Sequence, residues 1–89
     1  MPRRRRHYEL VVPSRVRTKL AVKHGISVEE AREAFERRGQ PRRGRDSPRG
    51  NRTYSMYGRT YDGRPLFLAV EQNPESPDRV TLITAYPPT

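Results

Sequence analysis

The sequence has no cysteine and only two histidines, His7 and His24. It therefore has no disulfide and no thiolate metal site, which is typical of a protein from a reducing compartment, and we expect a cytoplasmic location. No cluster of histidines and carboxylates has metal-ligand spacing, so the sequence predicts no bound metal and no other cofactor. Nucleophilic catalysis of the Ser-His-Asp type is disfavoured as well, because no nucleophile-elbow motif is present.

Apolar residues are also scarce, at 31% of the chain, and the mean hydropathy is -1.07. The longest apolar run is too short for a membrane span or for the core of a signal peptide, so we expect no membrane partner. A chain of 89 residues is expected to form one domain. Its small core should be marginally stable, and a bound partner would raise that stability by mass action.

Positive charge is what the chain has in excess. Nineteen basic residues against ten acidic ones give a net charge of +9, and seventeen of the nineteen are arginine. Guanidinium groups bind phosphates with two parallel hydrogen bonds, so this bias favours a nucleic acid or an acidic protein as partner. The alternative explanation is that arginine simply replaces lysine throughout. Arg3–Arg6 are consecutive and repel one another, so residues 1–7 are predicted to be a flexible basic arm before a single domain at 8–89.

Residues 23–35 predict a turn between two helices. Gly25 lies where a helix needs a left-handed residue just past its end. Ser27 with Glu30 three residues later forms a capping-box pattern, which marks the start of the next helix. The charged residues that follow are interrupted by apolar residues at helical spacing, so an amphipathic helix is expected there.

The other patterns complete a predicted order of β-α-α-β-β-β. Strands are expected over 8–12, 52–60, 66–71 and 79–86, and helices over about 15–24 and 28–38. Gly39 is expected to end the second helix. The last three strands should form an antiparallel meander, with two helices packed on one face of a small antiparallel sheet. This is an α+β, RelE-like arrangement, whose opposite face would be open to a ligand.

Residues 39–51 contain three glycines, two prolines and four arginines but no apolar residue, which indicates a mobile loop. One interpretation is a solvated linker. The other is a basic flap that either clamps RNA or is bound by an acidic partner. Basic and aromatic residues of this loop and of the strand after it are candidate RNA-binding residues. They are Arg42, Arg43, Arg45, Tyr57 and Arg59.

Arginines and tyrosines on or beside the predicted sheet suit phosphate chemistry without a metal. Guanidinium groups stabilise charge that develops on the phosphorus, and aromatic rings stack on bases. A carboxylate such as Glu71, a lysine or a histidine can move protons. Alternatively, the strand arginines are simply solvated charges on the sheet.

Three segments, taken in order and with their spacing, resemble the BrnT toxins, small members of the RelE/ParE toxin superfamily. They are 23–31 (KHGISVEEA), 58–67 (GRTYDGRPLF) and 78–85 (DRVTLITA). The resemblance covers about residues 14–87. It implies a metal-independent endoribonuclease of a type II toxin–antitoxin system, with RNA as substrate and a cognate antitoxin as protein partner.

The resemblance also implies residues for the site. Functional candidates at matching positions are Lys23, His24, Arg52 and Arg79. Thr81 and Tyr86 stand where BrnT toxins usually have arginine, although a tyrosine near the last strand is used by other members of the superfamily. Tyr86 is therefore a further catalytic candidate, and cleavage is expected to proceed by attack of the ribose 2′-hydroxyl. The alternatives are a nucleic-acid-binding module of the same fold that does not cleave, and a ParE-like toxin acting on another target.

Overall fold

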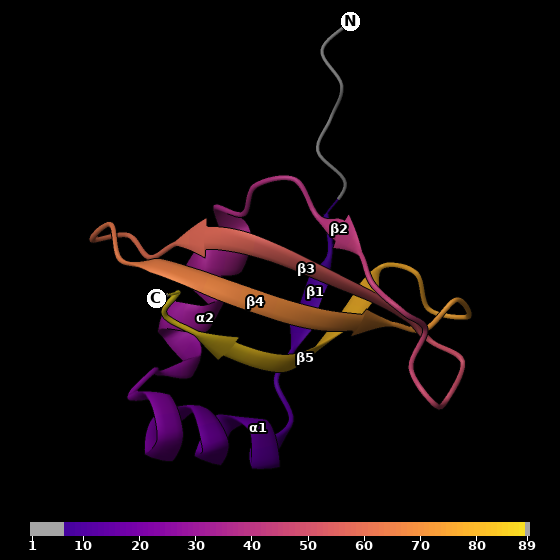
Figure 1. The fold of residues 1–89 in the computed structure, drawn as a ribbon, viewed down its shortest axis with the longest axis horizontal. Helices are drawn as coiled ribbons and strands as arrows, with labels where there is room; N and C mark the ends of the chain where they lie inside the picture. Colours follow the sequence, from indigo (N-terminus) through magenta and orange to yellow (C-terminus); the bar gives the residue numbers. More distant parts are fainter. Residues whose placement is uncertain (1–6, 89) are drawn as a thin grey trace, which may run out of the picture.

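The computed structural model describes residues 7–88, which form helical segments packed on a mixed β-sheet (Figure 1). The strands are β1 (Glu9–Val11), β2 (Arg42–Arg43), β3 (Arg52–Arg59), β4 (Pro65–Gln72) and β5 (Arg79–Tyr86). The helical segments are α1 (Ser14–Lys19), η1 (Leu20–His24) and α2 (Val28–Glu36). The predicted α+β class is confirmed, as is the order of the six predicted elements. The predicted arm falls outside the described residues except for His7.

The sheet has the order β1-β5-β4-β3-β2. Strands β3, β4 and β5 form the predicted antiparallel meander. The expectation of a wholly antiparallel sheet was wrong, however, because β1 pairs parallel to β5, with Leu10 opposite Val80. A parallel pair needs a long crossover between its strands, and here the helices together with the rest of the meander provide it.

The turn between the helices follows its sequence signals. Gly25 has φ 61°, in the left-handed region, and the amide of Ile26 donates to the carbonyl of Leu20 across it. Ser27 and Glu30 exchange side-chain-to-backbone hydrogen bonds of 3.1 Å, so the predicted capping box is present. The first helix differs from the prediction in one respect: its α-helical part ends at α1, and η1 continues it as a π-helical turn.

The predicted loop at 39–51 is more structured than expected. Gly39 does not end α2, which stops at Glu36; its φ is not positive, and its amide donates to the carbonyl of Tyr57 on β3 at 2.7 Å. The chain then runs along β3 and pairs with it as the two-residue strand β2. Backbone amides and carbonyls on the outer edge of β3 thereby form hydrogen bonds with β2. The composition of the loop alone does not predict this pairing.

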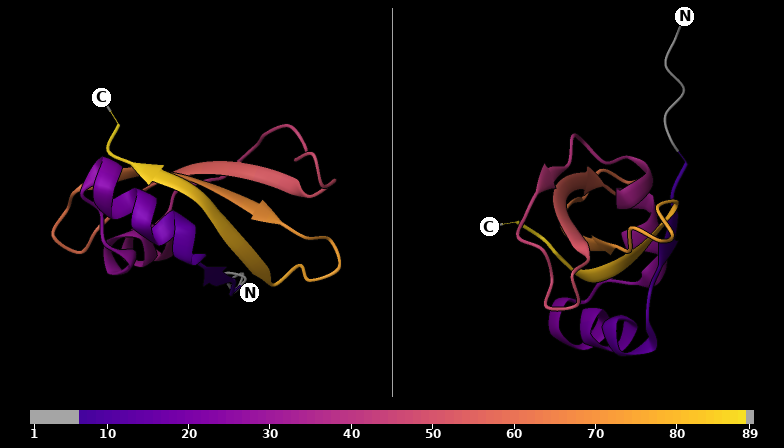
Figure 2. Two further views of the ribbon diagram at one scale, coloured as in Figure 1. Left: turned by 90° about the horizontal axis from the view of Figure 1, so that it is seen from below. Right: turned by 90° about the vertical axis from the view of Figure 1, so that its right-hand side faces the viewer.

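The core lies between the sheet and the helices. In Figure 1, β3, β4 and β5 face the viewer with α2 behind them and α1 below, and Figure 2 shows how strongly the sheet curls around α2. The largest fully buried apolar side chains are those of Leu20, Ile26, Leu66, Leu68, Val70 and Leu82. Strand β3 approaches α2 most closely at Gly58, where an added Cβ would lie 1.9 Å from the carbonyl oxygen of Ala34. The face toward the viewer is not covered by a helix, and we call it the open face.

A β-bulge decides which side chains of β5 reach the open face. Val70 pairs with Leu82 but its neighbour Ala69 pairs with Thr84, so Ile83 is an extra residue in β5. Before the bulge Leu82 points into the core, and after it Ala85 does. Tyr86 consequently lies on the open face.

Candidate nucleic-acid interface

Four rings lie side by side on the open face, and we call them the ring row. Tyr57, Phe67 and Tyr86 are directly opposite one another on β3, β4 and β5. Their ring centroids are 5.4 Å apart for the first pair and 4.9 Å for the second, within the range of aromatic contacts. The ring of His24 extends the row beyond β5, at 5.8 Å from Tyr86.

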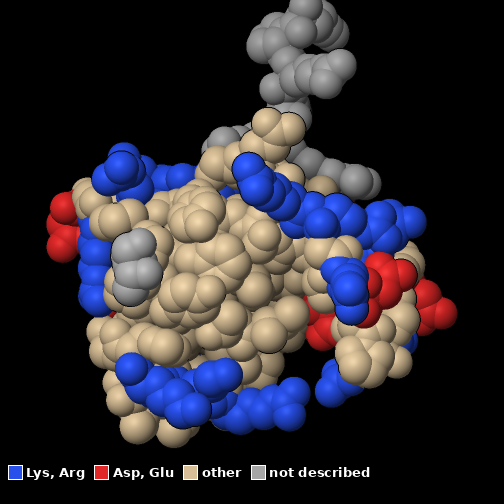
Figure 3. Space-filling model, in the orientation of Figure 1, with Lys and Arg blue, Asp and Glu red and all other residues tan. Residues whose placement is uncertain are grey.

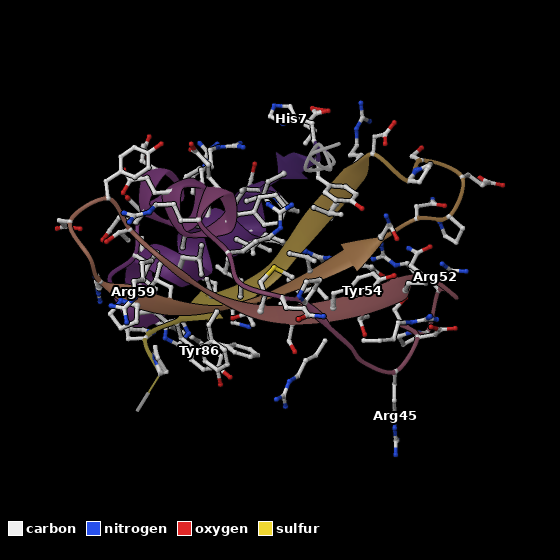
Figure 4. All side chains as sticks on the ribbon, turned by 90° about the horizontal axis from the view of Figure 1, so that it is seen from above. His7, Arg45, Arg52, Tyr54, Arg59 and Tyr86 are labelled. Atoms are coloured by element: carbon white, nitrogen blue, oxygen red, sulfur yellow. The ribbon has the colours of Figure 1, made fainter. Side chains whose placement is uncertain are left out.

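Backbone geometry sets the position of each ring. Side chains alternate between the two faces of a strand, and the neighbours of Tyr57 and Phe67 are buried toward α2. Tyr86 joins them because of the bulge, and Figure 4 shows it on the side of the sheet away from α2. His24 closes η1 just before the left-handed Gly25. The row therefore combines the end of a helix with three strands of the sheet.

The ring row is accessible to a ligand. Tyr57 is 60% exposed and Tyr86 is 38% exposed. Exposed aromatic rings on a sheet stack on unpaired bases, and each such stack contributes about 1–3 kcal/mol with little dependence on base identity. Tyrosine and histidine also carry polar atoms that can exchange protons.

Basic residues frame this uncharged area, as Figure 3 shows along its upper and lower margins. Arg42 is opposite Ser55 and Arg59 follows Tyr57 by two residues, so both arginines belong to the open face. The guanidinium of Arg59 donates to the carbonyl of Gly63 at 3.2 Å. Arg45 projects away from the sheet on the open side (Figure 4).

Arg43 differs from these predicted RNA-binding residues. It is opposite Tyr54, on the other face of the sheet from Arg42. Its guanidinium makes an ion pair with Asp46 at 3.0 Å, within the same loop. Arg43 therefore helps to shape the loop rather than the open face.

A groove of about 610 Å³ continues the open face toward α1. Arg15 and Lys19 of α1 line one side, and Arg49 of the loop after β2 lines the other. Glu71 of β4 and Thr81 of β5 are opposite each other on the floor. Because three of its lining residues are cationic, the groove suits an anionic chain better than a neutral ligand.

Hydrogen bonds hold the loop that forms one wall of the groove. The amide of Ser47 donates to the carbonyl of Asn51 at 2.8 Å, and the Ser47 hydroxyl accepts from the Asn51 amide at 3.1 Å. The side-chain amide of Asn51 donates in turn to Glu71 at 3.2 Å. The loop is thus fastened to the floor of the groove.

The predicted catalytic arginines do not converge. Arg52 is opposite Gln72, which is opposite Val80, and this set faces α2. Arg79 precedes Val80 in β5, so it belongs to the open face, where its Nε lies 3.3 Å from a carboxylate oxygen of Glu9. The two guanidinium groups therefore start from opposite faces of the sheet.

The other predicted catalytic residues divide into two places. His24 and Tyr86 are in ring contact, with the exposed Lys23 next to His24 in η1. Glu71 is on the same face but four residues from Phe67 along β4, which places it roughly 13 Å from the ring row. The structure thus brings His24 and Tyr86 together and separates Glu71 from them.

Sequence reasoning missed Phe67 and the cations of the groove. Phe67 lies in a strand that is apolar on both faces, so its residue type did not show that its ring, which is half-buried, lies on the open face. Arg15, Lys19 and Arg49 contribute to the high net positive charge of the sequence, but no motif distinguishes them from the other basic residues. Alternation along the strand at 66–71 was a usable signal, since it places Phe67 and Glu71 on one face.

The turn between β3 and β4 has two residues with shifted pKa values. The hydroxyl of Tyr61 donates to Glu36 of α2 at 2.6 Å, and this hydrogen bond raises the pKa of Tyr61. The hydroxyl of Thr60 donates to Asp62 and lowers the pKa of that carboxyl group. Arg64 adds an ion pair with Glu30 at 3.3 Å. The contacts of Tyr61 and Arg64 fasten the turn to α2, which lies on the opposite face of the sheet from the ring row.

Within residues 7–88, no three histidine, cysteine or carboxylate side chains gather as potential metal ligands. None of the helices described for this stretch is long and apolar enough to cross a membrane. Comparison of the chain with protein-family models and with curated proteins gives no match.

Proposed function

We propose that this protein is a metal-independent endoribonuclease of the toxin type, which binds single-stranded RNA on the open face of its sheet. The observation that carries the proposal is the ring row of His24, Tyr86, Phe67 and Tyr57, in which the two tyrosines are exposed and the other two rings half-buried, and which cations frame. Rings take the bases and cations take the phosphates, which is how single strands are bound in general. The resemblance of three segments to BrnT toxins supports the same class and a cytoplasmic site of action.

Cleavage is proposed to occur at the His24–Tyr86 end of the row. The ribose 2′-oxygen loses its proton to a base and forms a bond to the adjacent phosphorus. The bond from phosphorus to the 5′-oxygen breaks, and an acid returns a proton to that oxygen. The products are a 2′,3′-cyclic phosphate and a 5′-hydroxyl end. His24 and Tyr86 are the proton-transfer candidates because they are in contact, and Lys23 is near enough in sequence to stabilise the charged phosphate.

The test is incubation of purified protein with a labelled single-stranded RNA in the presence and absence of EDTA. We expect cleavage in both conditions and fragments that end in a 2′,3′-cyclic phosphate. His24→Ala is expected to abolish cleavage, whereas His7→Ala is the matched control and should retain it. Cleavage that stops with EDTA, or that persists in His24→Ala, would contradict the proposed mechanism.

The second candidate is a module of the same fold that binds RNA without cleaving it. The positions of Arg52 and Arg79 favour it, because these two predicted catalytic arginines start from opposite faces of the sheet and so do not converge on one phosphate. The distance of Glu71 from the ring row favours it too. RNA that is bound by the protein but recovered intact would decide for this candidate.

The proposed toxin class implies an antitoxin protein that binds the open face. An exposed apolar side chain beside the ring row supports such a contact: Ile83 of β5, three residues before Tyr86, is 40% exposed. A partner on this surface would raise the thermal stability of a small domain by several degrees and compete with RNA. Thermal melts with and without the product of a neighbouring reading frame test this, and identical melts at saturation would contradict it.

A further inference from the structure

The groove beside α1 contains one residue that does not suit an anion-binding surface. Glu71 lies on the floor, and three cationic residues line the walls, namely Arg15, Lys19 and Arg49. Among the described residues Glu71 makes no ion pair with any of them, and its one hydrogen bond comes from the Asn51 side chain at 3.2 Å. A half-buried carboxylate thus lies in the groove through which the sugar–phosphate backbone of a bound single strand would pass.

A carboxylate only accepts hydrogen bonds, and so do the phosphates of a nucleic acid, so the two groups cannot bond to each other. The sugar is different, because ribose carries a 2′-hydroxyl that can donate and deoxyribose does not. We propose that Glu71 accepts a hydrogen bond from a ribose 2′-hydroxyl and thereby makes the groove select RNA over DNA. This inference rests on the proposed function, since it assumes a single strand on the open face.

The positions along β4 make one continuous path for such a strand. Phe67 and Glu71 lie on the same face of β4, roughly 13 Å apart. A few nucleotides of single-stranded RNA span that distance. Bases stacked on the ring row would therefore leave the following sugars and phosphates in the groove. The cations attract any polyanion, so without an acceptor on the floor this path would not distinguish RNA from DNA.

Asn51 gives Glu71 its orientation. Its amide donates to the carboxylate oxygen Oε1, so the other oxygen is the one left to turn toward a ligand. Because Asn51 also closes the hydrogen-bonded loop that bears Arg49, the wall and the floor of the groove are connected. Selection of the sugar is in this view separate from the chemistry at His24 and Tyr86.

The test compares one short sequence made as RNA, as DNA and as 2′-fluoro RNA. The 2′-fluoro strand keeps the sugar pucker of RNA but has no hydroxyl donor. Binding is measured by fluorescence anisotropy in the His24→Ala protein, which is expected not to cleave, and the integrity of each RNA sample is checked on a gel after titration. We expect RNA to bind roughly tenfold more tightly than either other strand, the value of one hydrogen bond to a charged group.

Matched variants then assign the difference to one side chain. In Glu71→Ala the RNA preference should fall to near one, and DNA should bind more tightly because a repelling charge is gone. Glu75→Ala removes the same charge from the turn after β4, outside the groove, and should keep the tenfold preference. Equal binding of RNA and 2′-fluoro RNA to the His24→Ala protein, or a preference that survives the addition of Glu71→Ala, would overturn the inference while leaving RNA binding itself intact. Failure to bind any strand would overturn it together with the proposed function.

Discussion

The imidazole of His24 and the phenol of Tyr86 lie with their ring centroids 5.8 Å apart and their planes tilted by 40°. One residue ends a helical segment and the other ends the last strand, so neither reaches this position by local structure alone. The left-handed turn at Gly25 and the bulge at Ile83 bring them together. This contact is the most specific chemical feature of the open face, and two of the predictions below concern the ring row to which it belongs.

Tyr86→Phe separates stacking from proton transfer. The substitution keeps the ring against Phe67 and removes only the hydroxyl group. If that hydroxyl transfers a proton, single-turnover cleavage should fall roughly 100-fold while RNA affinity stays unchanged. Tyr61→Phe, in the turn tied to α2, serves as the control and should cleave normally. Unchanged cleavage by Tyr86→Phe would limit this residue to stacking.

Tyr57→Ala should weaken RNA binding roughly tenfold or more, because one base loses its stacking partner. The chain offers a closely matched control in Tyr61, which is 61% exposed against 60% for Tyr57 but lies away from the open face. Tyr61→Ala should leave the affinity unchanged. Equal losses in the two variants, measured by anisotropy at one salt concentration, would mean that the ring row does not bind the bases.

RNA affinity should fall steeply with salt, by roughly 0.7 logarithmic unit per phosphate contact for each tenfold rise in salt concentration. Arg15→Gln, Lys19→Gln and Arg49→Gln should each reduce the slope by about that amount, since these residues line the groove. Arg64→Gln is the control, because Arg64 pairs with Glu30 of α2. A salt slope that none of the three groove variants reduces would place the phosphate contacts outside the groove.

Gly58→Ala should destabilise the fold by about 3 kcal/mol or more, because its methyl group would meet the carbonyl of Ala34 at 1.9 Å and push α2 away from β3. Gly39→Ala is the matched control: its methyl group would meet the carbonyl of Tyr57 at an ordinary 3.6 Å. Chemical denaturation measures both. A Gly58→Ala protein as stable as the control would show that α2 can shift at little cost.

Alkaline pH should weaken the link between Tyr61 and α2. Folding raises the pKa of this tyrosine above 10.0 because its hydroxyl donates to Glu36. Its contribution to stability is therefore complete below pH 10 and is lost as the pH rises through the raised folded-state pKa. The free energy of unfolding of the wild type should fall above pH 10, and Tyr61→Phe should show a smaller fall. Parallel pH profiles would contradict this assignment.

The parts of the fold that short-range rules govern could be predicted from the sequence. The left-handed Gly25, the capping box of Ser27 and Glu30 and the bounds of the last strand are examples. Each depends on residues a few positions apart. The parallel pairing of β1 and the short β2 could not be predicted in this way, because both depend on which edge of the sheet a distant segment meets.

The site was predicted less well than the fold, for a related reason. Residue types pointed to rings and arginines on the sheet, but convergence depends on the face that each side chain takes. The pairing register of the strands determines on which face Arg52 and Arg79 lie. A shift of the register by one residue would move every side chain of a strand to the opposite face. His24 and Tyr86 were candidates through resemblance and residue type, and their contact became visible only with the turn and the bulge in place.

The extra residue in β5 is a position at which this strand can lose one residue without exchanging its faces. Ile83 is partly exposed, so many side chains would fit there without disturbing the core. Deleting it would remove the bulge and leave Leu82 opposite Val70 and Thr84 opposite Ala69 in a continuous ladder, so Ala85 would stay in the core and the phenol of Tyr86 on the open face. Loss of the bulge at unchanged length would instead turn Ala85 outward and Tyr86 toward the helices. A one-residue deletion at position 83 should thus be accepted among functional variants, whereas a one-residue insertion that pairs regularly in the ladder should be excluded.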